Sequence, residues 1–156
     1  MKQIVIFLGV FIFLISCKEA INNTYDKDKI QKQILDLGRS VVWGLNETNT
    51  DTLIRDFWKS DSAMFLIDGM KIEGFNNIQS ALEGIPDRRK KLDLDVHNEK
   101  VLVLSGNMAI HVVEFHEKVT HMNDSISTGQ GIWSTFYKKM QGDWKIIMVH
   151  ESHLIN

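Results

Sequence analysis

The chain has a single cysteine and a single proline among its 156 residues. One cysteine excludes an intrachain disulfide, so the fold must be held together by packing alone. Neither a glycine-rich phosphate loop nor a Gly-x-Ser-x-Gly segment occurs, so no nucleotide chemistry is indicated. The formal net charge is −2, and Arg88-Arg89-Lys90-Lys91 is the only basic run. This balance predicts no nucleic-acid partner.

The longest apolar run lies near the N-terminus, where twelve residues from Ile4 to Ile15 follow a short basic start. At about 1.5 Å per residue, such a run is too short to cross a hydrocarbon core of about 30 Å. It therefore predicts the core of a signal peptide.

This run leads into Leu14-Ile15-Ser16-Cys17, which resembles the bacterial lipoprotein box. In such proteins the cysteine is lipidated and becomes the first mature residue. The resemblance implies a lipoprotein signal peptide over residues 1–16, a tether over 17–25, and attachment to a membrane through lipid on Cys17. The expected location is the bacterial cell envelope, facing the periplasm or the surface. An ordinary secretory signal with an incidental cysteine is the alternative.

Residues 26–156 are predicted to form one domain that begins with helices. A long amphipathic helix starts near Asp26 or Asp28, either of which suits an N-cap. A short helix covers Asp51 to Trp58, and a third follows Asn76 or Asn77. Apolar residues recur at steps of three and four along the long helix, at Ile30, Ile34, Leu37, Val41 and Leu45.

Antiparallel strands are predicted to fill the rest of the domain. Asp68-Gly69 favours a two-residue hairpin turn, so we interpret Asp68 as a turn residue in preference to an acid catalyst. In the last hairpin, bulky side chains point to both faces of the strands. A strand with one face in water would alternate apolar and polar residues, so this hairpin is predicted to lie in the centre of the sheet. The expected strands are Met64–Ile72 with its internal turn, Leu92–His97, Val101–Leu104, Met108–Val119, Gly129–Tyr137 and Trp144–His153.

The segments Gly142-Asp143-Trp144-Lys145-Ile146 and His150-Glu151-Ser152-His153, together with the order of elements, resemble the nuclear transport factor 2-like superfamily, in particular its SnoaL-like branch. The resemblance implies an α+β fold in which a curved, cone-shaped antiparallel sheet wraps around the long N-terminal helix, with two shorter helices. It also implies a cavity inside the cone. The superfamily includes isomerases, cyclases, dehydratases and proteins without catalysis, so the fold alone does not give the function.

His150 is the predicted acid/base residue, because strand alternation places it on one face with Trp144, Ile146, Met148 and Ser152. A histidine that only packs within the sheet is the alternative. The predicted ligand-binding residues are Trp133, His111, Ser152 and Trp58. We expect a small-ligand-binding envelope protein; the alternative is an isomerase, cyclase or dehydratase. The absence of a phenol suited to the cavity argues against a ketosteroid-isomerase mechanism.

No cofactor and no metal site are predicted. Alternation places His150 opposite His153 and His111 opposite His116, while His97 and His121 are expected at strand ends or in loops. A zinc site assembled from different strands stays open. Because Trp144, Ile146 and Met148 cannot share a core with Ile147 and Val149, a homodimer through the outer face of the sheet is expected.

Overall fold

The computed structural model describes residues 25–154. Its three helices and six strands follow the predicted order, and the predicted tether, lipidation site and signal peptide lie outside the described residues, apart from Tyr25. In chain order, the elements are α1 (Lys27–Asn46), α2 (Thr50–Arg55), β1 (Met64–Ile67), β2 (Met70–Glu73), α3 (Phe75–Glu83), β3 (Arg89–Ser105), β4 (Met108–His121), β5 (Ile126–Met140) and β6 (Asp143–His153).

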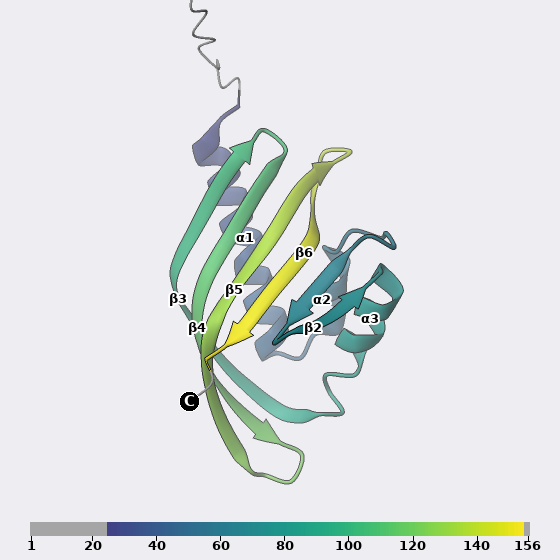
Figure 1. The fold of residues 1–156 in the computed structure, drawn as a ribbon. Coiled ribbons are helices and arrows are strands. Elements are labelled where there is room, and N and C mark those ends of the chain that lie inside the picture. Colours follow the sequence, from purple (N-terminus) through teal and green to yellow (C-terminus); the bar gives the residue numbers. More distant parts are fainter. Residues whose placement is uncertain (1–24, 155–156) are drawn as a thin grey trace, which may run out of the picture.

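The six strands form one curved sheet in the order β2-β1-β6-β5-β4-β3, and α1 lies against one face of it (Figure 1). The sheet is mixed, because β1 pairs with β6 in parallel. This corrects the expectation of a purely antiparallel sheet: β1 and β2 come before α3 in the chain, yet they add to the last strand. The rest of the predicted cone is confirmed, with its long helix, two short helices and curved sheet.

The long helix α1 begins as predicted, with Asp26 as its N-cap, whose side chain accepts a hydrogen bond of 3.0 Å from the Lys29 amide. Ile30 and Ile34 are buried against the sheet. One turn further on, Gly38 allows a close approach: a Cβ there would lie 2.4 Å from a ring carbon of His111 on β4. Glycine therefore sets how closely helix and sheet can pack.

The end of α1 is joined to the sheet through Asn46. Its side-chain amide donates to the Leu94 carbonyl at 3.2 Å, and its side-chain oxygen accepts from the Leu94 amide at 2.8 Å. The asparagine thus satisfies both backbone groups of one residue on β3, much as a neighbouring strand would. This contact fixes the start of β3 beside the C-terminal end of α1.

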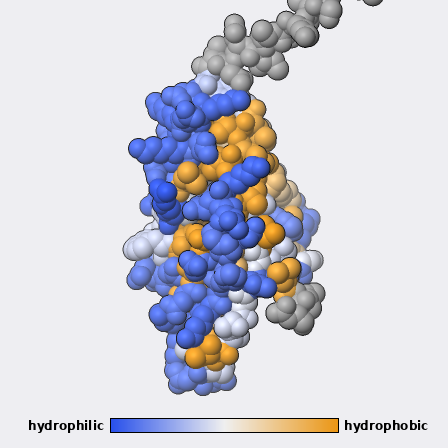
Figure 2. Space-filling view, turned by 90° about the vertical axis from the view of Figure 1, so that its left-hand side faces the viewer, coloured by the Kyte–Doolittle hydropathy of each residue, from blue (hydrophilic) through white to orange (hydrophobic). Residues whose placement is uncertain are grey.

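The outer face of the sheet carries an apolar row across four strands. Leu102, Ile110, Phe136 and Met148 are consecutive cross-strand partners, and Leu102 is 39% exposed. Figure 2 shows hydrophobic residues gathered in the upper part of the molecule, on the side of Figure 1 at which β3 lies. Trp144 and Ile146 do not belong to this face, because both are buried in the core. No helix among residues 25–154 is long and apolar enough to span a membrane.

Candidate functional site

A cavity lies between the sheet and the helices, near the C-terminal end of α1. Two adjoining pockets share five lining residues, and the larger has a volume of about 290 Å³. The wall is mostly apolar and comes from all three helices and all six strands. The shared residues are Leu45, Phe65, Leu82, Trp133 and Glu151. A cavity of this size and polarity suits a small, mostly apolar molecule.

A β-bulge in β6 decides which side chains reach this cavity. Tyr137 on β5 pairs with Ile146, but its neighbour Phe136 pairs with Met148, so the pairing skips Ile147. An extra residue in one strand reverses the alternation beyond it. Trp144 and Ile146 point inward before the bulge, and Val149 and Glu151 line the cavity after it.

The polar end of the cavity is built around Glu151 and His153 at the end of β6. The His153 Nε2 lies 3.4 Å from the Glu151 Oε1 and 3.4 Å from the Glu117 Oε1 of β4. Its Nδ1 lies 2.8 Å from the Asp68 Oδ2. The ring also meets Phe115 edge-on, with centroids 5.3 Å apart. Strands β4 and β6 and the turn between β1 and β2 therefore hold one imidazole among three carboxylates.

Asp68 has two roles at this site. As predicted, it is a turn residue, with φ of +47° between β1 and β2. Its carboxylate also accepts a hydrogen bond of 2.9 Å from the His153 amide, in addition to its contact with the His153 ring. The amide bond, with the ring contact adding to it, lowers the pKa of Asp68. The turn therefore positions a permanent anion beside His153.

Glu151 is a titratable group in the cavity wall whose pKa is strongly raised. Burial raises its pKa from 4.5 to about 7, although the nearby His153 opposes the change. Its side chain is 21% exposed, because it borders the cavity while protein atoms surround its other sides. A carboxyl group with a pKa near 7 exchanges protons readily at neutral pH, as a general acid or base requires.

For His153, the contacts with nearby carboxylates outweigh the effect of burial on the pKa. Burial on its own would lower the pKa of His153, but the contact with Asp68 and the charges of Glu151 and Glu117 outweigh it and raise the pKa. The ring therefore holds a proton more firmly than an ordinary histidine. This histidine stands next to the Glu151 carboxyl group, whose pKa is about 7.

Arg89, the first residue of β3, also lines the larger pocket. Its guanidinium donates to the Leu45 carbonyl at 3.1 Å, while its buried Nε has no hydrogen-bond partner among the described residues. Burial lowers the pKa of Arg89, and the charges of Glu117 and Glu151 oppose this. An unpaired buried donor is costly unless something accepts from it. Because Arg89 also lines the pocket, its guanidinium is a possible donor to an acceptor group of a ligand.

The site residues predicted from the sequence do not all lie in the cavity. Trp133 is buried in the cavity wall. His150 and Ser152 are exposed on the outer face, which corrects their predicted placement, because the bulge at Ile147 reverses the parity on which it rested. Trp58 is half-buried after α2 and is not among the described residues that line the cavity.

His111 is almost completely buried, as an inward-facing residue should be, but it packs under α1 instead of in the cavity wall. Its Nε2 lies 3.0 Å from the Glu99 Oε2. Burial lowers the pKa of His111, although Glu99 opposes this. The residues that sequence reasoning missed are Glu151, His153, Glu117 and Arg89. For Glu151 the only signal was a carboxylate in the polar segment His150-Glu151-Ser152-His153, which ends an apolar strand.

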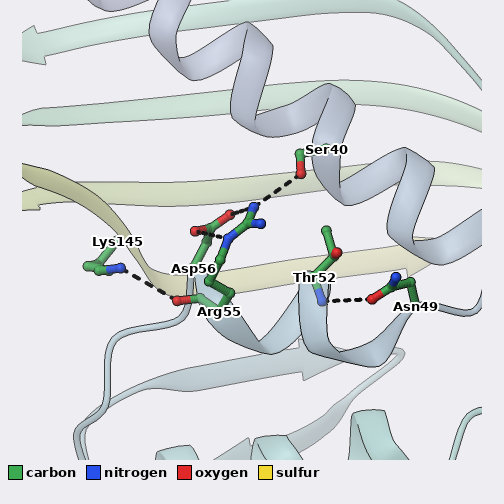
Figure 3. Close-up of polar contacts among 6 residues, drawn as sticks. All are labelled: Ser40, Asn49, Thr52, Arg55, Asp56 and Lys145. Atoms are coloured by element: carbon green, nitrogen blue, oxygen red, sulfur yellow. Dashed lines mark hydrogen bonds and ion pairs between the residues drawn. The ribbon is translucent and has the colours of Figure 1, made fainter.

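A second polar cluster joins α2 to its neighbours (Figure 3), and its residues do not line the two pockets. Arg55 binds the buried carboxylate of Asp56 through two hydrogen bonds of 3.1 and 2.9 Å, and also reaches the Ser40 hydroxyl at 3.3 Å. The Asp56 carbonyl accepts from the Ile146 amide at 2.7 Å. Because Asp56 is satisfied by these contacts, we assign the cluster a structural role: it fixes α2 to α1 and β6.

Comparisons with known proteins identify the fold. No family model and no curated protein matches the chain. A nuclear transport factor 2-like superfamily protein from Salmonella enterica is similar in structure, with a TM-score of 0.76 and 17% identity over 84% of this chain and 95% of that one.

Two further solved structures with this fold have names that refer to enzymes. A hexachlorocyclohexane dehydrochlorinase has a TM-score of 0.69 at 14% identity, covering 78% of this chain and 83% of that one. A provisionally assigned scytalone dehydratase from Novosphingobium aromaticivorans has a TM-score of 0.72 at 13% identity, covering 80% and 83%. At these identities the likeness establishes the fold and nothing further. The described part of this chain therefore has the nuclear transport factor 2-like cone fold.

Proposed function

We propose that this domain binds a small, mostly apolar ligand with one polar group, and that the ligand lies in the cavity with its polar end at Glu151 and Arg89. The carrying observation is the apolar cavity of about 290 Å³ that ends in a carboxyl group with a pKa of about 7. A cone with such a cavity is typical of a ligand-binding site. Solved structures with the same fold include proteins named as a dehydrochlorinase and a dehydratase, which supports this choice.

The proposal predicts that filling the cavity abolishes binding. The purified protein is incubated with a metabolite extract, and retained molecules are identified by mass spectrometry. Leu45→Trp places a larger side chain where both pockets meet and should reduce retention about tenfold or more, because the ligand and the indole compete for one volume. His150→Ala, on the outer face, is the matched control and should bind as the wild type does. Equal retention by Leu45→Trp, with its fold verified by circular dichroism, would reject the proposal.

Acid/base catalysis is the second candidate, and the arrangement of Asp68, His153 and Glu151 favours it. Glu151 would take or give a proton, and His153, held by Asp68, would stabilise the charge that forms on the carboxylate. Such chemistry suits an isomerase, cyclase or dehydratase. Once a ligand is known, Glu151→Gln should lower any turnover by about 100-fold or more while binding persists. Unchanged turnover in this variant would leave binding as the function.

We also propose that the protein is anchored by lipid on Cys17 and faces the periplasm or the surface of a bacterial cell. The support is Leu14-Ile15-Ser16-Cys17 after the apolar run. Cys17→Ser should leave the chain unprocessed or release it from the membrane fraction. The mass of the mature protein and its partition into detergent measure this, and an unchanged mass and partition would exclude the anchor.

A homodimer through the outer face of the sheet is proposed on the row Leu102, Ile110, Phe136 and Met148, since an exposed apolar patch commonly marks an interface. Light scattering should give twice the monomer mass at tens of micromolar, roughly the range in which a modest interface holds. Phe136→Glu should yield the monomer. A wild type that is monomeric at this concentration would count against the interface.

A further inference from the structure

Two histidines and an aspartate come together on the outer face of the sheet, opposite the cavity. Asp95 on β3 is the cross-strand partner of His116 on β4, and His97 lies two residues along β3 on the same face. One ligand atom from each of these side chains lies within 4.8 Å of the others. The two imidazole rings face each other with centroids 4.6 Å apart. The sequence predicts His97 at a strand end or in a loop, whereas the structure places it within β3, a strand of 17 residues whose pairing shifts register directly after His97.

The surrounding side chains favour ion binding at this position. The His97 Nε2 lies 3.6 Å from the Glu114 Oε2, and the His116 Nε2 lies 3.1 Å from the Gln130 Oε1. Metal-binding histidines usually direct their other ring nitrogen at a carboxylate or an amide oxygen, which fixes the ring and its tautomer. Each imidazole here has such a partner on the neighbouring strand.

We propose that Asp95, His97 and His116 bind a divalent transition-metal ion of the zinc class. Imidazole nitrogens with a carboxylate oxygen are the ligands that Zn²⁺, Ni²⁺ and Cu²⁺ prefer. In a tetrahedral zinc site with bonds of about 2.0–2.2 Å, ligand atoms are roughly 3.3 Å apart. The ligand atoms therefore have to approach one another by about 1.5 Å at most. Asp95 and His116 are exposed, so rotation of their side chains supplies this movement.

Strand pairing holds the backbone around the three proposed ligands rigidly, although their side chains can rotate. Hydrogen-bonded pairs between β3 and β4 continue without interruption from Lys91 with Thr120 to His97 with Glu114. The Cα positions of the three ligands are therefore fixed before an ion arrives, and only side-chain torsions need to adjust. Water can complete the coordination.

Titration of the untagged, chelator-treated full-length protein with ZnCl₂ in an isothermal calorimeter tests this site. We expect one Zn²⁺ per chain. His116→Ala and His97→Gln should each weaken binding about tenfold or more, because each removes one of three protein ligands. His150→Ala is the matched control: it removes an exposed histidine from the same face of the sheet and should change affinity less than about twofold.

Several results would overturn the proposal. These are no binding at millimolar zinc, affinity in His116→Ala equal to that of the wild type, or a loss in His150→Ala as large as in His116→Ala. A stoichiometry of one ion per two chains would also overturn it, since the ion would then be shared between copies. Circular dichroism of each variant separates lost ligands from lost folding. None of these outcomes depends on the cavity or its ligand.

Discussion

Replacement of Gly131 by alanine is expected to destabilise the domain by about 2–3 kcal/mol. Gly131 on β5 pairs with His153 on β6, and a Cβ there would lie 2.2 Å from the Ser152 carbonyl oxygen and 2.8 Å from the Phe115 ring. Backbone cannot rotate away as a flexible side chain can. The end of β6 would have to move, and Glu151 and His153 would move with it. Urea denaturation followed by tryptophan fluorescence measures the change.

Gly129→Ala is the matched control for this prediction. It lies two residues earlier on the same strand and face, and its added Cβ would meet the Glu117 side chain, with Oε1 at 2.8 Å and Cγ at 3.2 Å. Because that side chain can rotate, the cost should stay below about 1 kcal/mol. Equal stabilities for the two variants would show that the close approach at Gly131 carries no special constraint.

Glu151→Gln is expected to stabilise the protein at alkaline pH and to have little effect in acid. The pKa of Glu151 is about 7 in the folded chain, against an ordinary value of 4.5. Between these values the folded state binds more protons than the unfolded state, so this residue makes stability fall as pH rises from 4.5 to 7. One pKa unit corresponds to about 1.4 kcal/mol, so glutamine should gain roughly 1–3 kcal/mol at pH 8 and almost nothing near pH 4.5.

Thermal and urea unfolding of both proteins across this pH range provide the measurement. Glu83→Gln, which changes an exposed carboxyl group on α3, should shift neither the midpoint nor its pH dependence appreciably. A Glu151→Gln protein that is less stable than the wild type at pH 8 would mean that the carboxylate is stabilised by His153 and Arg89 more than burial destabilises it. The same comparison in the presence of a bound ligand would show whether the ligand favours the protonated form.

Most of the fold could be predicted because its signals are local. The spacing of Ile30, Ile34 and Leu37 indicates α1, Asp68-Gly69 indicates the turn between β1 and β2, and the polar link before Trp144 indicates the last hairpin. The parallel pairing of β1 with β6 could not be predicted from such signals. It joins segments about 80 residues apart, and no local pattern in either strand specifies that partner.

The residues of the site were harder to predict from the sequence than the fold, and the reason is a β-bulge in β6. The prediction assumes strict alternation of side chains along β6 from Trp144 to His150. One extra residue in the strand moves every side chain beyond it to the opposite face of the sheet. Ile146, Ile147 and Met148 are all apolar, so the sequence carries no mark of where the bulge lies. Strict alternation that places His150 on the inner face of the sheet therefore places Glu151 and His153 on the outer face. Asp68 was interpreted correctly as a turn residue, but its contact with His153 is a tertiary one.

The position of the cavity along α1 has a consequence for how a ligand would arrive. Val41 and Leu45, which line it, are in the last two turns of the helix, about 20 Å or more from Lys27 at a rise of 1.5 Å per residue. Figure 1 shows the chain entering α1 at the end of the molecule opposite the tip of β6. With the proposed lipid on Cys17, the bilayer would lie beyond the entry end and the polar end of the cavity would point away from it. Such an orientation suits capture of molecules from the aqueous compartment rather than extraction of lipids from the membrane.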